Sequence, residues 1–187
     1  MAVSLLESRV FLSATVSETV KPTAITPTSL EPIDEGVVII RPAGAADARG
    51  TFFRAFDAPD YALHGLPFSV VQAALSHNGR RGTTRGLHYQ ADAAPEAKIV
   101  GCVRGAIFDV AVDLRPGSPT RGRHVAVTLN GKDLLHVPPG VAHGFQTLED
   151  ECIVSYLISA PYRVELQRGV RWNDPRFGID WPSSTSS

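Results

Sequence analysis

The sequence predicts an all-β protein that folds as a single jelly-roll barrel. Short apolar runs rich in β-branched residues recur along the chain, and Gly, Pro, Asn and Asp separate them at regular intervals. Several runs alternate apolar and polar residues, as over residues 107–113, which is the pattern of a half-buried strand. Only one short stretch has helical character. Eight to twelve short strands without long helices indicate a jelly-roll barrel.

The expected elements follow one another along the chain. A β-branched run over residues 37–42 (VVIIRP) closes at a proline, and a short helical pattern follows over 58–64. Residues 68–75 (FSVVQAAL) and 85–90 (RGLHYQ) are expected as strands. The remaining runs, each bounded by turn residues, are a strand pair over 98–115 and single strands over 124–129, 134–140 and 152–158.

The composition indicates one folded domain with short extensions. A chain of 187 residues has the length of one ordinary domain. Residues 1–32 are rich in Ser, Thr and Pro, so we expect a flexible extension or an edge strand. We therefore predict a domain over residues 33–182 and a disordered tail over 183–187.

Charge and hydropathy argue against two classes of function. Eighteen basic and 19 acidic residues give a net charge of −1, without the basic stripe expected of a nucleic-acid binder. The sequence contains no run of 18 apolar residues, so no membrane span is expected. Cys102 and Cys152 lie in apolar contexts, where two buried thiols are favoured over a disulfide. A cytoplasmic location is expected.

The segment 85–90 carries the strongest candidate for acid–base chemistry. In a regular strand, His88 and Gln90 share one face and Arg85 lies on the other, so we expect His88 and Gln90 to point together into the barrel. An imidazole there is a natural general base, because its ordinary pKa of about 6.5 lies near working pH. Gln90 then becomes a candidate substrate contact. A histidine satisfied within the core is the alternative for His88.

Three more residues extend this candidate site. If the strand that begins at Lys98 returns beside His88, its ammonium stabilises the enolate oxygen formed by proton abstraction next to a carbonyl. A solvated edge charge is the alternative for Lys98. His143 follows a Pro-Gly turn and is a second candidate pocket histidine. Asp109 lies in an apolar run, and a buried carboxylate usually has a partner, here a histidine, a turn or an arginine.

Other side chains suit proton donation or substrate binding. Tyr156 lies on a late strand, where a phenol belongs to the core or donates a proton. The planar guanidinium groups of Arg49 and Arg85 suit phosphates. Phe52 and Tyr162 are suited to stacking on a flat base.

Taken together, these motifs resemble the dTDP-4-dehydrorhamnose 3,5-epimerase family. The matching segments cover most of the chain from Asp47 to Pro182, and the combination of RGLHYQ, DVAVDLRPGSPT and AHGF is highly specific. The other matching segments are DARGTFFRAF, VVQAALS, VSY and RGVRWNDPRFGIDWP.

The resemblance implies a cupin-type double-stranded β-helix, usually a homodimer, that needs neither a metal nor a redox cofactor. It implies an epimerase that inverts C3, C5 or both in a nucleotide-linked 4-keto-6-deoxyhexose, such as dTDP-4-keto-6-deoxyglucose. His88 then matches the base, Tyr156 the acid that reprotonates from the opposite face, and Asp109 a pocket aspartate. The positions that match substrate or nucleotide contacts are Arg49, Phe52, Gln72, Arg85, Lys98, His143 and Tyr162.

The chain departs from the family pattern at several positions. Ala74 replaces a usual Asn, Arg54 a usual carboxylate and Gln167 a usual Glu. Many members also continue past the final WP to an aspartate that partners the catalytic histidine, whereas Pro182 is followed here by SSTSS. We therefore expect Asp109 or another carboxylate to support the His88 imidazolium.

Other functions fit parts of the pattern. A metal-dependent cupin needs three or four His or Glu ligands, and the sequence lacks the His-x-His pair of that cluster. A non-catalytic sugar-nucleotide binder would keep the arginines and aromatics but would not exchange substrate protons. An epimerase that acts on one carbon only is a further possibility within the enzyme class.

Overall fold

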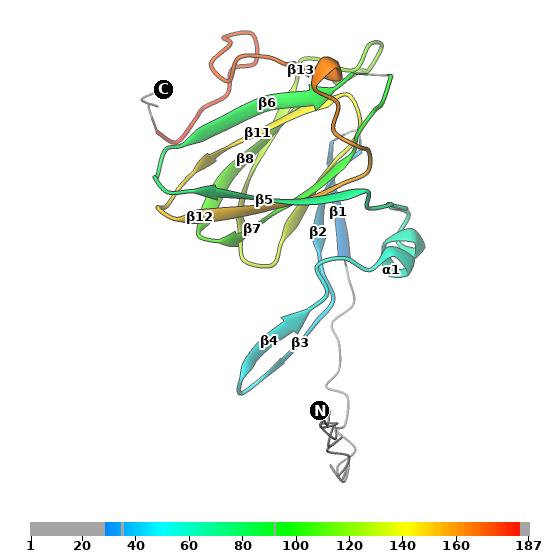
Figure 1. Cartoon of the computed structure of the whole chain (residues 1–187), viewed down its shortest axis with the longest axis vertical. Helices are drawn as coiled ribbons and strands as arrows, with labels where there is room; N and C mark the ends of the chain where they lie inside the picture. The colour runs from blue at the N-terminus through cyan, green and yellow to red at the C-terminus, as the bar shows by residue number, and fades with distance from the viewer. Residues whose placement is uncertain (1–28, 35, 92, 184–187) are drawn as a thin grey trace, which may run out of the picture.

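The fold is built almost entirely from β-strands, as the sequence predicts. The computed structural model describes residues 29–34, 36–91 and 93–183. Two antiparallel sheets pack face to face, and a separate hairpin projects away from them (Figure 1). The all-β, cupin-type jelly-roll class is therefore confirmed.

One face of the barrel is a six-stranded sheet in the order β1-β2-β10-β7-β12-β5. Every neighbouring pair in it is antiparallel. Its strands are β1 (Ser29–Asp34), β2 (Val37–Arg41), β5 (Gln72–Asn78), β7 (Lys98–Arg104), β10 (Leu134–Val137) and β12 (Cys152–Ile158).

The opposite face is a five-stranded sheet in the order β13-β6-β11-β8-β9. Its strands are β6 (Thr84–Gln90), β8 (Ala106–Asp113), β9 (His124–Asn130), β11 (Val141–Thr147) and β13 (Gln167–Gly169). The projecting hairpin consists of β3 (Gly44–Asp47) and β4 (Gly50–Phe53). The helical elements are α1 (Ala58–Leu63) and a 3-10 turn over Val164–Leu166.

Alternating residues of both sheets fill the space between them. Val100 and Val154 from the six-stranded sheet meet Ile107 and Phe145 from the five-stranded sheet in one buried apolar cluster. Burial of apolar surface is the main force that holds the two sheets together. Because the strands alternate, polar residues at inward positions also enter this interior, and there they form the candidate site.

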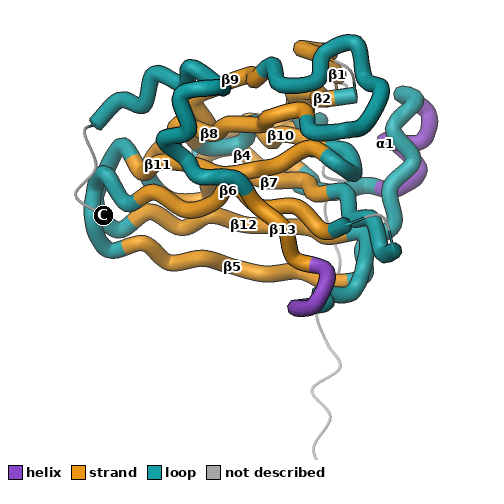
Figure 2. Tube along the Cα trace, turned by 90° about the horizontal axis from the view of Figure 1, so that it is seen from above, coloured by secondary structure: helices purple, strands orange, loops and turns teal. Residues whose placement is uncertain are grey.

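The outer faces of the sheets are covered in part by segments without strands. Helix α1, capped by Asp57, buries Tyr61 against Ile40 and Ile99 of the six-stranded sheet. The loop after β13 crosses the five-stranded sheet (Figure 2), where Trp181 and its neighbours pack in the cluster formed around Leu87. Both coverings bury apolar side chains that would otherwise lie in water.

The strand pair expected over 98–115 differs from the structure. Its two strands exist as β7 and β8, but a turn at Gly105, with φ of +78°, carries the chain from one sheet into the other. Strand β1, at the edge of the six-stranded sheet, pairs with β2 and includes residues 29–32 of the segment expected as a flexible extension or an edge strand. Residues 1–28 of that segment and residues 184–187 of the predicted tail lie outside the described residues.

Two further findings concern membrane-spanning helices and the state of the two cysteines. In the described ranges, no helix is long and apolar enough to cross a membrane. Cys102 and Cys152 are buried as free thiols, Cys102 on β7 and Cys152 on the neighbouring β12.

Candidate active site

A cavity opens between the two sheets, where strands β6 and β11 face strands β7 and β12. A space of about 410 Å³ is lined by side chains that include Arg85, His88, Lys98, His143 and Tyr156. A second space, of about 230 Å³, shares His88, Lys98 and Tyr156 and extends toward Gln90, Glu96, Tyr162 and Gln167. The structure therefore places most of the predicted site residues around two spaces that share part of their lining.

A β-bulge in β6 brings Arg85 and His88 to the same cavity. His143 of β11 lies opposite His88, and two residues later Phe145 lies opposite Arg85, so β6 carries one extra residue between these pairs. The extra residue reverses the strand alternation. The prediction that Arg85 faces away from His88 is therefore wrong. The bulge requires Gly86, with φ of +100°, because a Cβ there would lie 2.5 Å from the His143 carbonyl oxygen.

His88 has the environment of an unprotonated base. Burial lowers the pKa of its ring below the ordinary 6.5, and the positive charge of Lys98 and the neighbouring His143 lower it further. Its side chain still borders both spaces. An imidazole in this position is neutral near pH 7 and accessible to a ligand in the cavity.

Lys98 lies beside His88, at the start of β7. Its Nζ is 2.8 Å from Oε1 of Glu96 and donates a longer hydrogen bond of 3.4 Å to the main-chain oxygen of His88. The ammonium therefore borders the same spaces as the imidazole. This placement allows a cation to face negative charge that develops next to His88.

Asp109 supports His143, not His88. Nε2 of His143 lies 2.8 Å from Oδ1 of Asp109, and both side chains are almost fully buried. Within the described residues, no carboxylate is hydrogen-bonded to the His88 ring, so the expectation that Asp109 supports His88 is not met. The second oxygen, Oδ2, has no hydrogen-bond partner among the described residues. The dyad fixes the orientation of His143 at the cavity wall.

Tyr156 enters the cavity from β12, in the sheet opposite to His88. Burial raises the pKa of its phenol, the charge of Asp109 raises it further, and Arg85 opposes them. Its ring meets the His143 ring edge to face, with centroids 6.1 Å apart. Tyr156 therefore keeps its proton at neutral pH and holds it in the cavity.

The smaller space is bordered by loops that glutamine side chains fix in place. Gln72 accepts a hydrogen bond of 2.7 Å from the Tyr162 main-chain N–H, and the Tyr162 hydroxyl donates to Gln167. The Gln90 amide is 2% exposed and bonds to main-chain groups of Ala94, Pro161 and Arg163. Because the Gln90 amide is engaged in hydrogen bonds within the protein, Gln90 contributes to the shape of the space.

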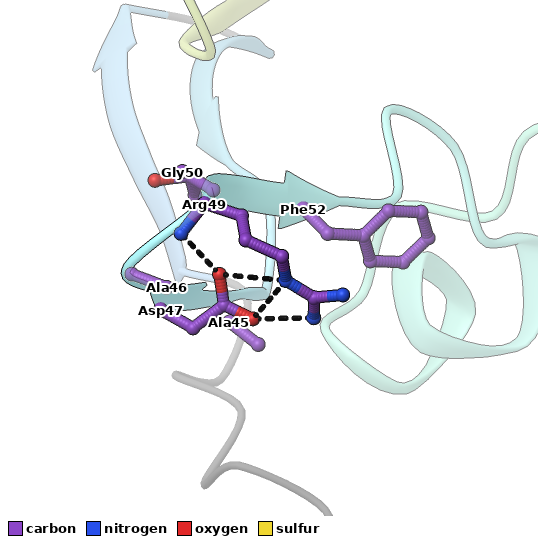
Figure 3. A pocket seen from close by; sticks show the side chains of 7 residues that line it. Ala45, Ala46, Asp47, Arg49, Gly50 and Phe52 are labelled. Carbon is purple, nitrogen blue, oxygen red and sulfur yellow. Dashed lines mark hydrogen bonds and ion pairs between the residues drawn. The ribbon is translucent and has the colours of Figure 1, made fainter.

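Arg49 and Phe52 are predicted site residues that lie on the β3–β4 hairpin, away from this cavity. Both belong to the projecting hairpin, where they border a separate hollow of about 420 Å³ (Figure 3). The Arg49 guanidinium is paired with Asp47 at 2.6 Å and remains 89% exposed, and Phe52 is 71% exposed. Within one chain, the structure does not bring them to His88.

Sequence reasoning missed two residues that shape the site. Glu96 pairs with Lys98, and Asn78 of β5 accepts a hydrogen bond of 2.7 Å from Nε of Arg85. The Glu-x-Lys spacing before a strand was a usable signal, since residues two apart in an extended chain point to the same side. Asn78 gave no local signal, because it lies on a strand of the other sheet from Arg85.

The chain is similar to known sugar epimerases over most of its length. The family model for dTDP-4-dehydrorhamnose 3,5-epimerase matches residues 32–187. A dTDP-4-dehydrorhamnose 3,5-epimerase of Sinorhizobium fredii is 43% identical over 152 residues, which cover 80% of this chain and 78% of the relative.

Solved structures of such enzymes share the fold. NovW, a 4-keto-6-deoxy sugar epimerase from the novobiocin biosynthetic gene cluster of Streptomyces spheroides, superposes with a TM-score of 0.80 at 37% identity, covering 89% of this chain and 85% of that one. A dTDP-6-deoxy-D-glucose-3,5-epimerase of Legionella pneumophila in complex with dTDP-4-keto-L-rhamnose gives a TM-score of 0.77 at 36% identity, covering 83% and 84%.

Proposed function

This chain belongs to the dTDP-4-dehydrorhamnose 3,5-epimerase family, and we propose that His88 is the base and Tyr156 the acid of its reaction. The protein is an isomerase that inverts C3, C5 or both in a nucleotide-linked 4-keto-6-deoxyhexose. One observation carries the assignment of roles. His88 and Tyr156 reach the same cavity from opposite sheets, so a sugar between them has the base on one face and the acid on the other.

The reaction needs only proton transfers. The C4 ketone acidifies the hydrogens at C3 and C5. When His88 takes one of them, the C–H electron pair forms a carbon–carbon double bond and the carbonyl π pair moves to oxygen, which gives an enolate. The enolate oxygen then re-forms the carbonyl, and the electron pair of the carbon–carbon double bond takes the Tyr156 proton on the opposite face of that carbon. Proton exchange with water returns the His88 imidazolium and the Tyr156 phenolate to their starting states. The centre is inverted without any change in oxidation state.

The protonation states support these roles. The lowered pKa of His88 leaves its ring free to accept a proton near pH 7, and the raised pKa of Tyr156 keeps its phenol protonated until a carbanion forms. An acid and a base whose environments move their pKa values apart are typical of paired proton transfer.

Lys98 and His143 are the groups proposed to stabilise the enolate. The ammonium of Lys98 supplies a positive charge at the cavity wall. Nε2 of His143 faces Asp109, so Nδ1 is the ring nitrogen that a substrate group can meet. Donors that are held in place before the reaction lower its barrier because they need no reorganisation.

The nucleotide part of the substrate is proposed to contact Arg85 and Tyr162. Arg85 is held by Asn78 and offers its remaining guanidinium donors to a diphosphate. Tyr162, whose ring borders the smaller space and is 56% exposed, offers a face for a nucleobase. The binding of a dTDP-sugar by the Legionella pneumophila enzyme supports dTDP as the nucleotide.

We also propose a homodimer, in which the hairpin of one protomer reaches the cavity of its partner. Arg49 and Phe52 are exposed on a hairpin that extends beyond the sheets (Figure 1). Because they do not reach the cavity of their own chain, they can contact a substrate only in the cavity of a second copy. Leu75 and Val103 are 72% and 58% exposed on the six-stranded sheet, which gives an apolar surface for a second copy. A cytoplasmic location stays a prediction.

Solvent deuterium incorporation tests the proposed function. The wild-type protein, incubated with dTDP-4-keto-6-deoxyglucose in heavy water and followed by NMR, is expected to exchange the hydrogen at C3, at C5 or at both, and the labelled carbons identify the inverted centres. His88→Ala should abolish exchange, whereas Tyr156→Phe should impair reprotonation and alter the configuration of the product. His77→Ala, at an exposed histidine outside the cavity, is the control. Exchange by His88→Ala at the wild-type rate would refute the assignment of the base.

A further inference from the structure

A largely buried ion pair between Glu96 and Lys98 lies within the candidate active site. Oε1 of Glu96 is 2.8 Å from Nζ of Lys98, and the two side chains are only 9% and 14% exposed. Both residues line the smaller space together with His88 and Tyr156. The pair therefore borders the volume that the reacting sugar has to enter.

The protein holds Glu96 in this place through its main chain. Gln90 donates a hydrogen bond of 2.7 Å to the carbonyl of Ala94, and Ser159 accepts one of 2.8 Å from the N–H of Ala97. Glu96 lies between these anchors, and Lys98 follows two residues later as the first residue of β7. The carboxylate is thus presented to the ammonium by an anchored segment.

Lysine needs such a partner to act as an enolate-stabilising group. Its ammonium sits on a flexible four-carbon stem, so an unrestrained Lys98 would lose conformational freedom when it met the enolate. A buried ammonium without a counter-charge is also unfavourable. In addition, proton transfer to His88 creates a second cation next to Lys98, and the charge of Glu96 offsets the repulsion between them.

We propose that Glu96 is a positioning residue, which holds the charged Lys98 ammonium next to the C4 oxygen of the substrate. The inference rests on the proposed function, because it concerns the same proton abstraction. Glu96 itself contacts neither the proton in transfer nor the reacting carbon in this proposal. Its effect on the rate passes through Lys98.

Substitution of Glu96 tests this role. Glu96→Gln keeps the size but removes the charge, and we expect kcat for deuterium exchange to fall about 10- to 100-fold, as for other residues that orient a catalytic group, with little change in KM. Glu96→Asp, which keeps the charge, should recover part of the rate. Glu151→Gln, which removes a carboxylate paired with His77 on the exposed surface, should keep the wild-type rate.

A double-mutant cycle separates an effect through Lys98 from a general structural effect. If Glu96 acts through Lys98, Glu96→Gln has no further effect on exchange in the Lys98→Met background, so the two losses are not additive. A full additional loss in the double variant would overturn the proposal. A wild-type rate in Glu96→Gln would also overturn it, while the activity of the wild-type protein in the same assay would leave the proposed function intact.

A second measurement does not depend on activity. The chain has three lysines, so a protein labelled at the lysine ε-carbons gives three signals, and Lys98→Met identifies the one from Lys98. NMR relaxation is expected to show a restricted Lys98 side chain in the wild type, and a side chain as mobile as exposed Lys132 in Glu96→Gln. Equal mobility of Lys98 and Lys132 in the wild type would refute the proposal even if the protein showed no epimerase activity.

Discussion

At the scale of single residues, the site depends on how its charged groups affect one another. His88 has no hydrogen-bonded carboxylate among the described residues, and Lys98 and His143 both lower its pKa. A carboxylate partner would have the opposite effect, because it favours the protonated ring. The His88 ring is therefore neutral at neutral pH, as the proposed base has to be, and its imidazolium is less stable after proton transfer.

The pH dependence of the reaction should reveal this environment. The base works only when it is neutral, so activity is lost as pH falls through the His88 pKa, and a lowered pKa places that acid limb below 6.5. In Lys98→Met, NMR titration of the ring should show a higher His88 pKa, still below 6.5 because burial is the larger cause. Lys132→Met should leave the value unchanged, and a His88 pKa equal or lower in Lys98→Met would contradict the charge argument.

The sequence identified the residues of the site better than it identified their partners. His88, Lys98 and Tyr156 lie at inward positions of recognisable strands, and the structure places them around one cavity. The partner of Asp109 was not predictable, because it depends on strand order. Strand β8 neighbours β11 and not β6, so the carboxylate of Asp109 reaches His143 and not His88.

At the scale of elements, the bulge in β6 decides which side chains reach the cavity. The alternation rule places Arg85 outside, and the register shift at Gly86 turns it inward, to the same cavity as His88. A single-residue insertion in a strand leaves no trace in the pattern of apolar residues. The strand itself was therefore predictable here, whereas the side of the strand on which Arg85 lies was not. The β3–β4 hairpin was missed for a related reason, since its exposed strands lack an apolar run.

Substitution of the bulge glycine tests this account. In Gly86→Ala, the new Cβ would lie 2.5 Å from the His143 carbonyl oxygen and 2.6 Å from Gly144 Cα, so β6 and β11 have to separate. We expect a loss of about 3–5 kcal/mol in the free energy of unfolding, from left-handed backbone strain and overlap together. Urea denaturation measures it.

Gly117→Ala is the matched control for that experiment. Gly117 has φ of +77°, but no atom lies within 4 Å of the position that an added Cβ would take, so only the backbone strain applies. A loss of about 1–2 kcal/mol is therefore expected. Equal losses in the two variants would show that the close approach of β6 to β11 is not needed for stability.

At the scale of the whole molecule, the cavity and the hairpin lie at different places in one protomer. His88, Lys98 and Tyr156 lie between the sheets, whereas Arg49 and Phe52 lie on the β3–β4 hairpin, which leaves the barrel (Figures 1 and 3). A hairpin that does not pack on its own domain exposes apolar surface without gain. The proposed two-fold symmetric dimer would resolve this, because it would place each hairpin at the partner's cavity and make both sites equivalent.

Complementation between two inactive variants tests the dimer and the hairpin together. His88→Ala lacks the base but keeps the hairpin, and the double variant Arg49→Ala/Phe52→Ala keeps the cavity but lacks the hairpin side chains. In a mixed dimer, the second chain's cavity meets the first chain's intact hairpin, so one complete site forms. Random pairing of equal amounts should restore about a quarter of the wild-type sites, because half of the dimers are mixed and each has one complete site of two.

The control for this experiment is a mixture of His88→Ala with Tyr156→Phe, in which every cavity lacks one of its own groups and no dimer regains a complete site. Both mixtures are prepared by co-expression with two affinity tags. The mixed dimers are isolated, which leaves one complete site of two in the hairpin mixture, and formation of the wild-type product is then measured by NMR. Recovery only in the hairpin mixture would establish that Arg49 and Phe52 act across the interface. Isolated mixed dimers that are no more active than the separate variants would show that the hairpin does not serve the partner's cavity.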